Sequence, residues 1–225
     1  MSIELKIVRH DRMFSFVDSC KECIYGCDFD CIYCWARAKD KNGRQIIPTF
    51  NQRSLSIPPI SNTLVFLNSR SDMFCLYSKA DWIHQIFNYI RRYPKTNFLI
   101  MTKNPYGYNA FRKEIPINII CGATIETNRD TSKFSKAPVA LDRFIEMYNL
   151  IWPNKFISIE PVIDFDPEIF TRWLLSIKPI AIAIGYDNYN NHLPEPKRIE
   201  VEALIRTLEN HGIKVFRKTI REKWN

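Results

Sequence analysis

Glycine is scarce in this sequence, and none of its apolar runs is long. Only 6 of the 225 residues are glycine, and no G-x-G-x-x-G or G-x-x-x-x-G-K-[ST] pattern follows an apolar run, which disfavours a standard dinucleotide or P-loop site. No run approaches the roughly 20 apolar residues that a membrane-spanning helix needs. The start, MSIELKIVRHDR, carries charges where a signal peptide needs an unbroken apolar stretch. We therefore expect a cytoplasmic protein that does not enter a membrane.

Hydrophobic residues make up 46% of the chain and aromatic residues 13%, so the chain can bury a full core. We expect a single domain over residues 1–225. The net charge of +8 suits a phosphate-bearing partner, because clustered Lys and Arg release counterions from nucleic acid. The basic residues occur in small groups, however, and each group by itself is typical of a solvated surface. Charge alone does not identify the partner.

Short apolar, β-branched runs alternate with amphipathic stretches along the chain. This alternation predicts parallel βαβ units, which either close into a barrel or open into a doubly wound sheet. Both folds place ligands at the carboxyl ends of the strands. The predicted strands are 13–17, 63–69, 97–102, 117–125, 155–161, 180–185 and 213–216. The predicted helices are 78–93, which starts at a capping box of Ser78 and Asp81, and 141–148, 167–177 and 199–208.

Five of the seven cysteines lie close together, in the segment CKECIYGCDFDCIYC over residues 20–34. Disulfides are rare inside cells, so such a cluster is expected to hold a metal or a catalytic thiol. One grouping joins Cys20 and Cys23 with Cys31 and Cys34, as two C-x-x-C pairs around a zinc ion. The other joins Cys27 with Cys31 and Cys34, three thiolates that suit three corners of a 4Fe-4S cluster. Spacing alone does not separate the two groupings.

The surrounding residues favour the second grouping. GCDFDCIYCWAR, with an aromatic residue before its last cysteine, closely resembles the signature of the radical S-adenosylmethionine (radical SAM) superfamily. Further segments occur in the order seen in a poorly characterised radical SAM family often found in phage genomes, and the loop more distantly resembles that of spore photoproduct lyases. The chain departs from these relatives in its extra pair Cys20 and Cys23, and IAIAIGYDN lacks their Gly-Gly-Glu run. The similar segments are LVFLNSRSDMF, FLIMTKNP, GATIETNRD, FISIEPV and FRK.

The resemblance implies a partial (β/α)6-type radical SAM barrel with parallel strands, in which Cys27, Cys31 and Cys34 ligate a 4Fe-4S cluster. S-adenosylmethionine would chelate the fourth iron, and its reductive cleavage would yield a 5′-deoxyadenosyl radical that abstracts hydrogen from an unidentified substrate. The chemistry implies an external electron donor of the flavodoxin or ferredoxin type. The basic residues and the likeness to photoproduct lyases favour a nucleic acid or nucleotide as the substrate, with a peptide or a small molecule as the alternatives.

Polar side chains at the first strand ends are candidates for binding this cofactor. Ser69, Ser71 and Asp72 offer acceptors for the cationic amino group of the methionine moiety. The ring of Tyr33 could lie against the adenine or shield the cluster. The plainer interpretation of Asp72 is that it caps the turn after its strand.

Three further candidates follow later strands. Glu126 and Thr127 are placed to bind the ribose hydroxyls, and Glu160 is placed to serve the cofactor or the substrate. The alternative for Glu126 is an ion pair with a nearby Arg or Lys.

Two other functions would use the same cysteines. A zinc-stabilised nucleic-acid-binding protein needs both C-x-x-C pairs, and a non-catalytic iron–sulfur electron carrier needs a fourth thiolate, for example Cys23. Cys75 and Cys121 lie in or beside apolar segments, where buried, unreactive thiols are expected. The enzyme is favoured, because neither alternative explains why the loop stands at the head of a βα series.

Overall fold

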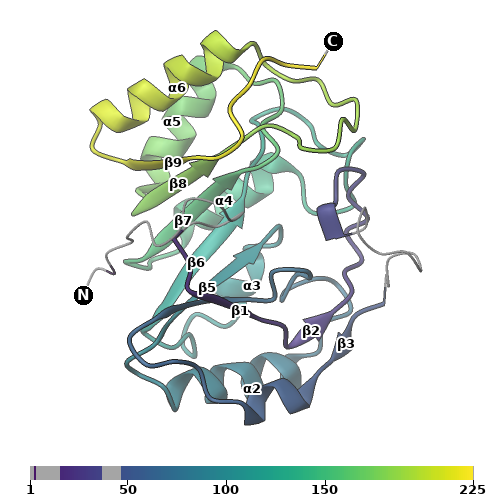
Figure 1. Cartoon of the computed structure of the whole chain (residues 1–225), viewed down its shortest axis with the longest axis vertical. Coiled ribbons are helices and arrows are strands. Elements are labelled where there is room, and N and C mark those ends of the chain that lie inside the picture. The colour runs from purple at the N-terminus through teal and green to yellow at the C-terminus, as the bar shows by residue number, and fades with distance from the viewer. Residues whose placement is uncertain (1–2, 4–15, 37–46, 225) are drawn as a thin grey trace.

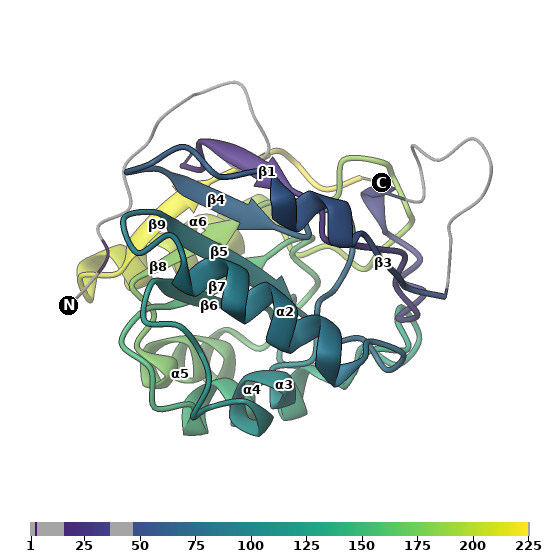
Figure 2. The same cartoon turned by 90° about the horizontal axis from the view of Figure 1, so that it is seen from below.

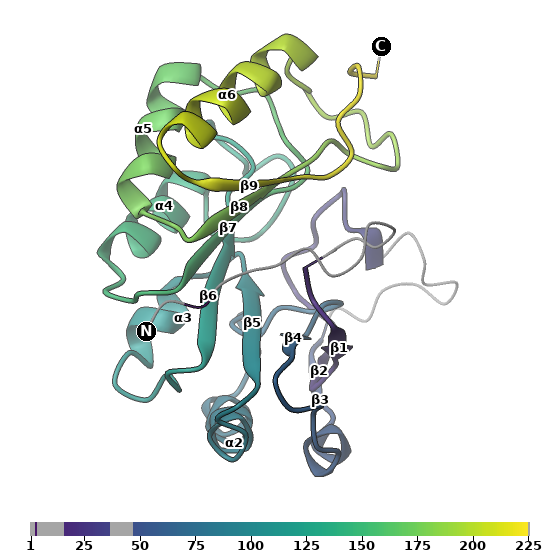
Figure 3. The ribbon, with the colours of Figure 1, turned by 60° about the vertical axis from the view of Figure 1, so that its left-hand side comes forward.

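A curled, parallel, seven-stranded sheet forms the centre of the protein (Figure 1). The computed structural model describes residue 3 and residues 16–36 and 47–224. From one edge to the other, the strands are β1 (Ser19–Lys21), β4 (Leu64–Leu67), β5 (Asn97–Thr102), β6 (Ile119–Thr124), β7 (Lys155–Ile159), β8 (Ala181–Ile184) and β9 (Lys214–Arg217). Figure 3 shows that the sheet curves into an open half-barrel. The predicted α/β fold with a partial barrel is confirmed.

The helices cover the convex face of the sheet (Figure 2). They are α2 (Ala80–Arg91), α3 (Tyr106–Ala110), α4 (Ala140–Asn149), α5 (Pro167–Ile177) and α6 (Arg198–Asn210). A separate antiparallel pair, β2 (Ile24–Tyr25) with β3 (Thr49–Phe50), is followed by the 3-10 helix η1 (Gln52–Ser56). This pair lies against α2, because Phe50 stacks on Trp82 with 5.6 Å between the ring centroids. The concave face carries a second set of apolar side chains.

Successive residues of a strand point to opposite faces of the sheet, which divides the core in two. In β5, Phe98 and Ile100 belong to the apolar cluster between sheet and helices, whereas Leu99 and Met101 belong to a second cluster on the concave face. A register shift of one residue would exchange these two sets, so the side chains themselves hold the register. Burial on both faces explains why the strands read as continuous apolar runs.

The starts of two helices show how local sequence signals succeed and fail. The side chain of Asp166 accepts a hydrogen bond from the Ile169 N–H at 2.9 Å, and Pro167 follows in the first turn of α5, where its missing N–H is not needed. The predicted capping box of α2 is wrong, because no side chain caps this helix. The Ser78 hydroxyl instead lies 3.2 Å from the sulfur of Cys75.

The first predicted strand, 13–17, is wrong in its described part, and residues 13–15 lie outside the described residues. Phe16 and Val17 are in no strand but are buried in the concave-face cluster, where Phe16 stacks on Phe216 with 4.4 Å between centroids. Their apolar character thus reflects packing inside the half-barrel. The other six predicted strands match β4 to β9 to within two residues at each end. None of the helices in the described part of the chain is long and apolar enough to cross a membrane.

Candidate functional site

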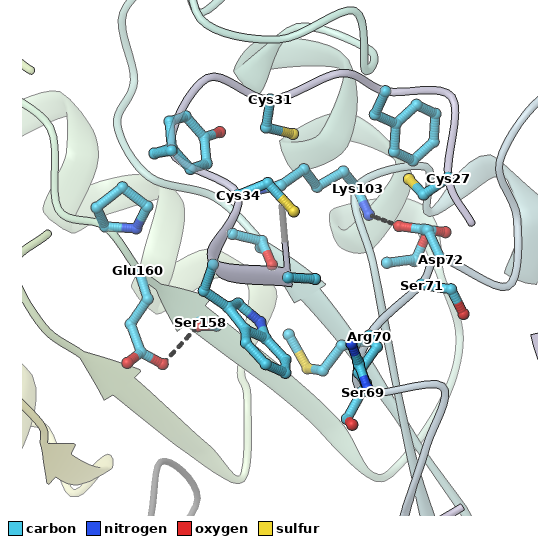
Figure 4. A pocket seen from close by; sticks show the side chains of 18 of the residues that line it. Cys27, Cys31, Cys34, Ser69, Arg70, Ser71, Asp72, Lys103, Ser158 and Glu160 are labelled. Atoms are coloured by element: carbon cyan, nitrogen blue, oxygen red, sulfur yellow. Dashed lines mark hydrogen bonds between the residues drawn. The ribbon is translucent and has the colours of Figure 1, made fainter. Parts of the chain in front are cut away.

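A cavity of about 210 Å³ opens at the carboxyl edge of the sheet. Its walls are the cysteine loop and the residues that end or follow β4, β5, β6, β7 and β8. Figure 4 shows the cysteines together on one side, with Ser69 to Asp72 and Glu160 on two other sides. The carboxyl ends of parallel strands meet at one edge, so residues far apart in the sequence come together here.

Three of the clustered cysteines, Cys27, Cys31 and Cys34, line this cavity (Figure 4). Backbone hydrogen bonds of 2.9 and 2.7 Å fasten their loop to the segment 134–136. The sulfur of Cys31 also lies 3.1 Å from the hydroxyl of Ser135. The loop therefore presents three thiols to the cavity from a backbone that other segments hold in place.

Cys20 and Cys23 lie apart from these three. Cys20 is exposed on β1, whereas Cys23 is fully buried in the cluster between sheet and helices. The sulfur of Cys23 lies 3.9 Å from the Ser54 hydroxyl, and burial raises the pKa of the thiol to about 11. The structure thus does not bring together the four sulfurs of the zinc grouping.

Cys75 and Cys121 are buried, as predicted. Cys75 packs in the same apolar cluster as Cys27 and hydrogen-bonds to its side chain, although Cys75 does not line the cavity. Cys121 lies in β6 between the sheet and the helices, where burial raises the pKa of its thiol well above the ordinary value.

The set of cavity-lining thiols fits a 4Fe-4S cluster that keeps one iron for a ligand. Thiolates that hold such a cluster each bind a different iron, so their sulfurs need not converge on one point. Across residues 16–36 and 47–224, no group of three or more His, Cys, Asp or Glu side chains is arranged to hold a single metal ion. Three cysteine ligands would leave an open coordination position, as catalytic metal sites do.

Glu126 is fully buried just behind the cavity wall. Its carboxylate accepts hydrogen bonds from the Tyr33 hydroxyl at 2.5 Å, from Arg143 at 2.6 Å, and from the ammonium group of Lys103. Burial acts to raise the pKa of Glu126, but Arg143 and Lys103 outweigh it and lower the pKa to about 2. Glu126 does not line the cavity, and the structure shows the ion pair that was the alternative interpretation of this residue. Its contact with the ribose hydroxyls stays a prediction.

Two further predicted residues, Thr127 and Tyr33, differ in whether they line the cavity. Thr127 is buried outside the cavity lining, and its hydroxyl donates to the Asp164 carbonyl oxygen at 2.7 Å. Tyr33 does line the cavity, and its ring centroid lies 5.0 Å from the Lys103 nitrogen. Burial and the neighbouring Glu126 carboxylate raise the pKa of Tyr33 well above its ordinary value.

Asp72 lines the cavity on the loop after β4, but its carboxylate is used within the protein. One oxygen accepts from the Phe74 N–H at 2.9 Å and from the Thr102 hydroxyl at 2.7 Å. The other accepts from the Lys103 N–H at 2.7 Å. Burial raises the pKa of Asp72 in spite of these bonds. The bond from the Phe74 N–H agrees with the plainer interpretation, a cap of the turn after β4. The bonds from Thr102 and Lys103 also join this loop to the end of β5.

Ser69 and Ser71 line the cavity beside Asp72. The Ser69 hydroxyl donates to the Glu22 carboxylate, and the Ser71 hydroxyl donates to the Ile24 carbonyl oxygen at 2.6 Å. Because both hydroxyl hydrogens are donated to the protein, the oxygens keep acceptor lone pairs for a ligand.

Glu160 lines the cavity at the end of β7. It accepts a hydrogen bond from Ser158 at 3.0 Å, shown as a dashed line in Figure 4. Burial raises the pKa of Glu160, although the positive charge of Lys218 acts in the opposite direction. This carboxylate, unlike that of Glu126, meets the cavity directly.

Sequence reasoning gave no specific role to two cations of the site. The sequence shows Lys103 as a polar residue directly after a predicted strand, but it does not show which side chains Lys103 contacts. Arg143 lies on α4, whose amphipathic pattern gives no signal that one cation turns inward to a buried glutamate.

The site and the fold together define an α/β half-barrel with a three-cysteine cavity at its carboxyl edge. The chain belongs to DUF5131, a family of proteins of unknown function, whose family model matches residues 5–169. No curated protein matches the chain in a sequence search.

Among solved structures, the fold is similar to that of spore photoproduct lyase, a radical SAM enzyme. A Cys-to-Ser mutant of that enzyme has a TM-score of 0.65 at 9% identity, over 96% of this chain and 80% of the lyase chain. A Tyr-to-Phe mutant has a TM-score of 0.64 at 8% identity, over 98% and 81%. A double mutant with bound AdoMet and dinucleoside spore photoproduct has a TM-score of 0.57 at 9% identity, over 83% and 59%. At such identity the likeness shows the fold alone.

Proposed function

We propose that the protein is a radical SAM enzyme, which binds a 4Fe-4S cluster through Cys27, Cys31 and Cys34 and S-adenosylmethionine in the adjoining cavity. The observation that carries this proposal is that these three thiols share one cavity at the carboxyl edge of a half-barrel. The similar fold of a lyase with bound AdoMet supports it. When bound, the two cofactors supply electron-initiated hydrogen abstraction from a substrate.

In this reaction the protein's own residues bind and orient the methionine moiety. The oxygens of Ser69 and Ser71 have acceptor lone pairs free, and the carboxylate of Asp72 lies on the same loop. Acceptors and a negative charge suit a cationic amino group. Asp72 also keeps the loop in place through its bonds to Thr102 and Lys103.

Glu126 acts here as a positioning residue for Tyr33 and Lys103. Its carboxylate is shared by two cations, Lys103 and Arg143, so the buried group carries one excess positive charge. A positive charge in a poorly solvated site favours anionic groups beside it, such as thiolates or a ligand carboxylate. The sequence also predicted that Glu126 and Thr127 bind the ribose hydroxyls. To do so, both side chains would have to give up their present hydrogen-bond partners.

The rim of the cavity suits a nucleic acid or nucleotide substrate. Arg70 and Tyr189 line the cavity with exposed side chains, and Glu160 faces it from the end of β7. Cationic and aromatic side chains bind phosphates and stack on bases. An external electron donor of the flavodoxin or ferredoxin type completes the proposal, because the chemistry needs an electron.

Anaerobic reconstitution of the full chain with iron and sulfide tests the proposed function. We expect bound iron and sulfide, and 5′-deoxyadenosine when S-adenosylmethionine and dithionite are added. Parallel reactions with DNA, with RNA and without nucleic acid test the substrate class, since a true substrate should increase product formation. A protein that binds zinc and takes up no iron at any stage would overturn the proposal.

A further inference from the structure

One wall of the cavity has no part in the proposed binding of the cluster or of the methionine moiety. It consists of residues 186–189, which follow β8 and which we call the β8 wall. Three strands of the sheet stand between β8 and β4, whose turn carries the proposed contacts to the methionine moiety. The β8 wall therefore bounds the cavity from a different part of the half-barrel.

Two side chains of the β8 wall, Asn188 and Tyr189, are exposed and line the cavity. Tyr189 is 43% exposed, so a large ring is accessible at the rim. An aromatic ring stacks on any nucleobase, because every base has a π face. The amide of Asn188 carries donors and an acceptor, which match the hydrogen-bonding edge of a base. Together the two side chains suit a flat ring with polar edges.

The backbone of the β8 wall is held in a turn by Asp187, which is only 4% exposed. Its carboxylate accepts from the Tyr189 N–H at 3.1 Å and from the N–H and side-chain amide of Asn191 at 2.5 and 2.8 Å. Aspartate side chains that accept from N–H groups shortly after them define a local turn. The position of Tyr189 thus follows that of Asp187.

An arginine from a later segment fastens both ends of the loop that begins with the β8 wall. Nη2 of Arg221 donates to the Asp187 carbonyl oxygen at 2.6 Å, and its two terminal nitrogens donate to the two carboxylate oxygens of Glu195 at 2.9 and 2.7 Å. The guanidinium carbon also lies 5.0 Å from the ring centroid of Tyr186 and 4.2 Å from that of Trp224. The Glu195 side chain is only 2% exposed, and a two-bond pair of this kind fixes geometry as well as adding energy.

We infer that Tyr189 and Asn188 bind a nucleobase of the substrate on the β8 wall, and that Arg221 is the positioning residue of this wall. The inference rests on the proposed function, which gives a nucleic acid or nucleotide as the substrate class. Arg221 does not line the cavity, so it acts through the loop between Asp187 and Glu195.

The contact itself is tested with Tyr189→Leu, which keeps an apolar side chain but removes the ring. Binding of fluorescently labelled single-stranded DNA and RNA oligonucleotides to anaerobically reconstituted protein is measured by anisotropy. We expect the oligonucleotide that the wild type binds to be held roughly tenfold more weakly, the usual effect of losing one base stack. Tyr189→Phe keeps the ring and should bind within a factor of two or so of the wild type. The affinity for S-adenosylmethionine, measured by calorimetry, should not change in either variant.

The positioning role is tested with Arg221→Lys, which keeps the charge but replaces the planar fork by a single ammonium group. We expect several-fold weaker oligonucleotide binding, with the iron content and the affinity for S-adenosylmethionine as in the wild type. Arg217→Lys is the matched control, because Arg217 also bonds to two carboxylates, those of Glu202 and Glu209, and does not line the cavity. It should leave both affinities unchanged.

The double variant Arg221→Lys, Tyr189→Leu separates positioning from a general loss of structure. If Arg221 acts by placing Tyr189, the combined loss should be smaller than the product of the two separate losses. Separate losses that multiply fully would overturn the positioning role.

Unchanged oligonucleotide binding in Tyr189→Leu, or an equal loss of S-adenosylmethionine binding, would overturn the inference and leave the radical SAM chemistry standing. Wild-type protein that forms 5′-deoxyadenosine but binds neither DNA nor RNA would overturn the inference together with the proposed substrate class. Wild-type protein that binds an oligonucleotide through Tyr189 but takes up no iron would overturn the proposed function instead.

Discussion

Two regions of this protein use the same residue types for different ends. One is the interior, where Glu126 and Cys23 are each fully buried, do not line the cavity and are bonded within the protein. The other is the cavity wall, where Glu160 and Cys31 meet the open volume. Both glutamates stand within two residues of the end of neighbouring strands, and both cysteines belong to one short segment. Residue type and strand-end position therefore do not tell which group can meet a ligand.

The two glutamates show the physical difference. Glu126 has two cationic partners and a phenol, which lower its pKa to about 2 against the opposing effect of burial. Glu160 has one hydroxyl donor and a more modest influence from Lys218, so burial prevails and raises its pKa. The charge of Glu126 thus serves the stability of the fold through its buried ion pairs, whereas the carboxylate of Glu160 is available to a ligand.

The largest effect is expected from the cysteines of the cavity wall. Cys27→Ala, Cys31→Ala or Cys34→Ala should each remove the cluster and all cleavage of S-adenosylmethionine, because each would leave only two thiolates. Iron, sulfide and 5′-deoxyadenosine are measured after anaerobic reconstitution. Cys75→Ala is the control, since this thiol contacts Cys27 but does not line the cavity. Full iron content in Cys31→Ala would show that the wrong cysteines were grouped.

The next largest effect is expected behind the cavity. Glu126→Gln leaves Arg143 and Lys103 without their buried counter-ion, and such a change costs about 3–5 kcal/mol. We expect the thermal midpoint at pH 7 to fall by roughly 10 °C. An unchanged midpoint would mean that the buried network contributes nothing to stability.

The difference in stability between the wild type and Glu126→Gln should also depend on pH, which gives a second measurement. The pKa of about 2 in the folded protein lies below the ordinary value of 4.5, so Glu126 stabilises the fold above pH 4.5 and loses this contribution as the pH falls toward 2. The contribution is on the order of 3 kcal/mol. The gap in stability between wild type and Glu126→Gln should therefore narrow below pH 4.5. A gap that stays constant with pH would contradict the lowered pKa.

A smaller effect on the thermal midpoint, of opposite sign, is expected when Glu160 on the cavity wall is replaced by glutamine. The raised pKa of Glu160 means that burial favours its protonated form, so its contribution to stability is lost as the pH rises. Glutamine resembles the protonated acid, and Glu160→Gln should leave the thermal midpoint at pH 7 unchanged or raise it slightly. A fall as large as that of Glu126→Gln would remove the distinction between the two glutamates.

The smallest effect is expected from the two cysteines outside the cavity. The double variant Cys20→Ser, Cys23→Ser should still bind iron and sulfide and still form 5′-deoxyadenosine, because neither sulfur lines the cavity. Any loss of stability should come from the hydroxyl placed at the buried position of Cys23. If the variant loses zinc and folding together, and no iron binds at any stage, the zinc grouping is correct.

The fold could be predicted well because its signals are local. A strand buried on both faces must be a short apolar run, and six of the seven sheet strands were found in this way. The segment 13–17 misled the prediction, since Phe16 and Val17 are apolar for another reason, their burial inside the half-barrel. Cys27, Cys31 and Cys34 also lie within one short loop; their spacing alone left the zinc grouping open, and the resemblance of the surrounding residues to the radical SAM signature favoured these three, which line the cavity.

Only the tertiary structure decided which polar groups face the cavity. The ion pair of Glu126 depends on Arg143, which reaches it from a helix that the sequence shows only as amphipathic. The position of the loop after β8 depends on Arg221, which binds Asp187 and Glu195 from 34 and 26 positions later in the chain. Such contacts join segments that are distant in sequence, and no local pattern encodes them, because a side chain's partners are set by how the whole sheet curls and packs.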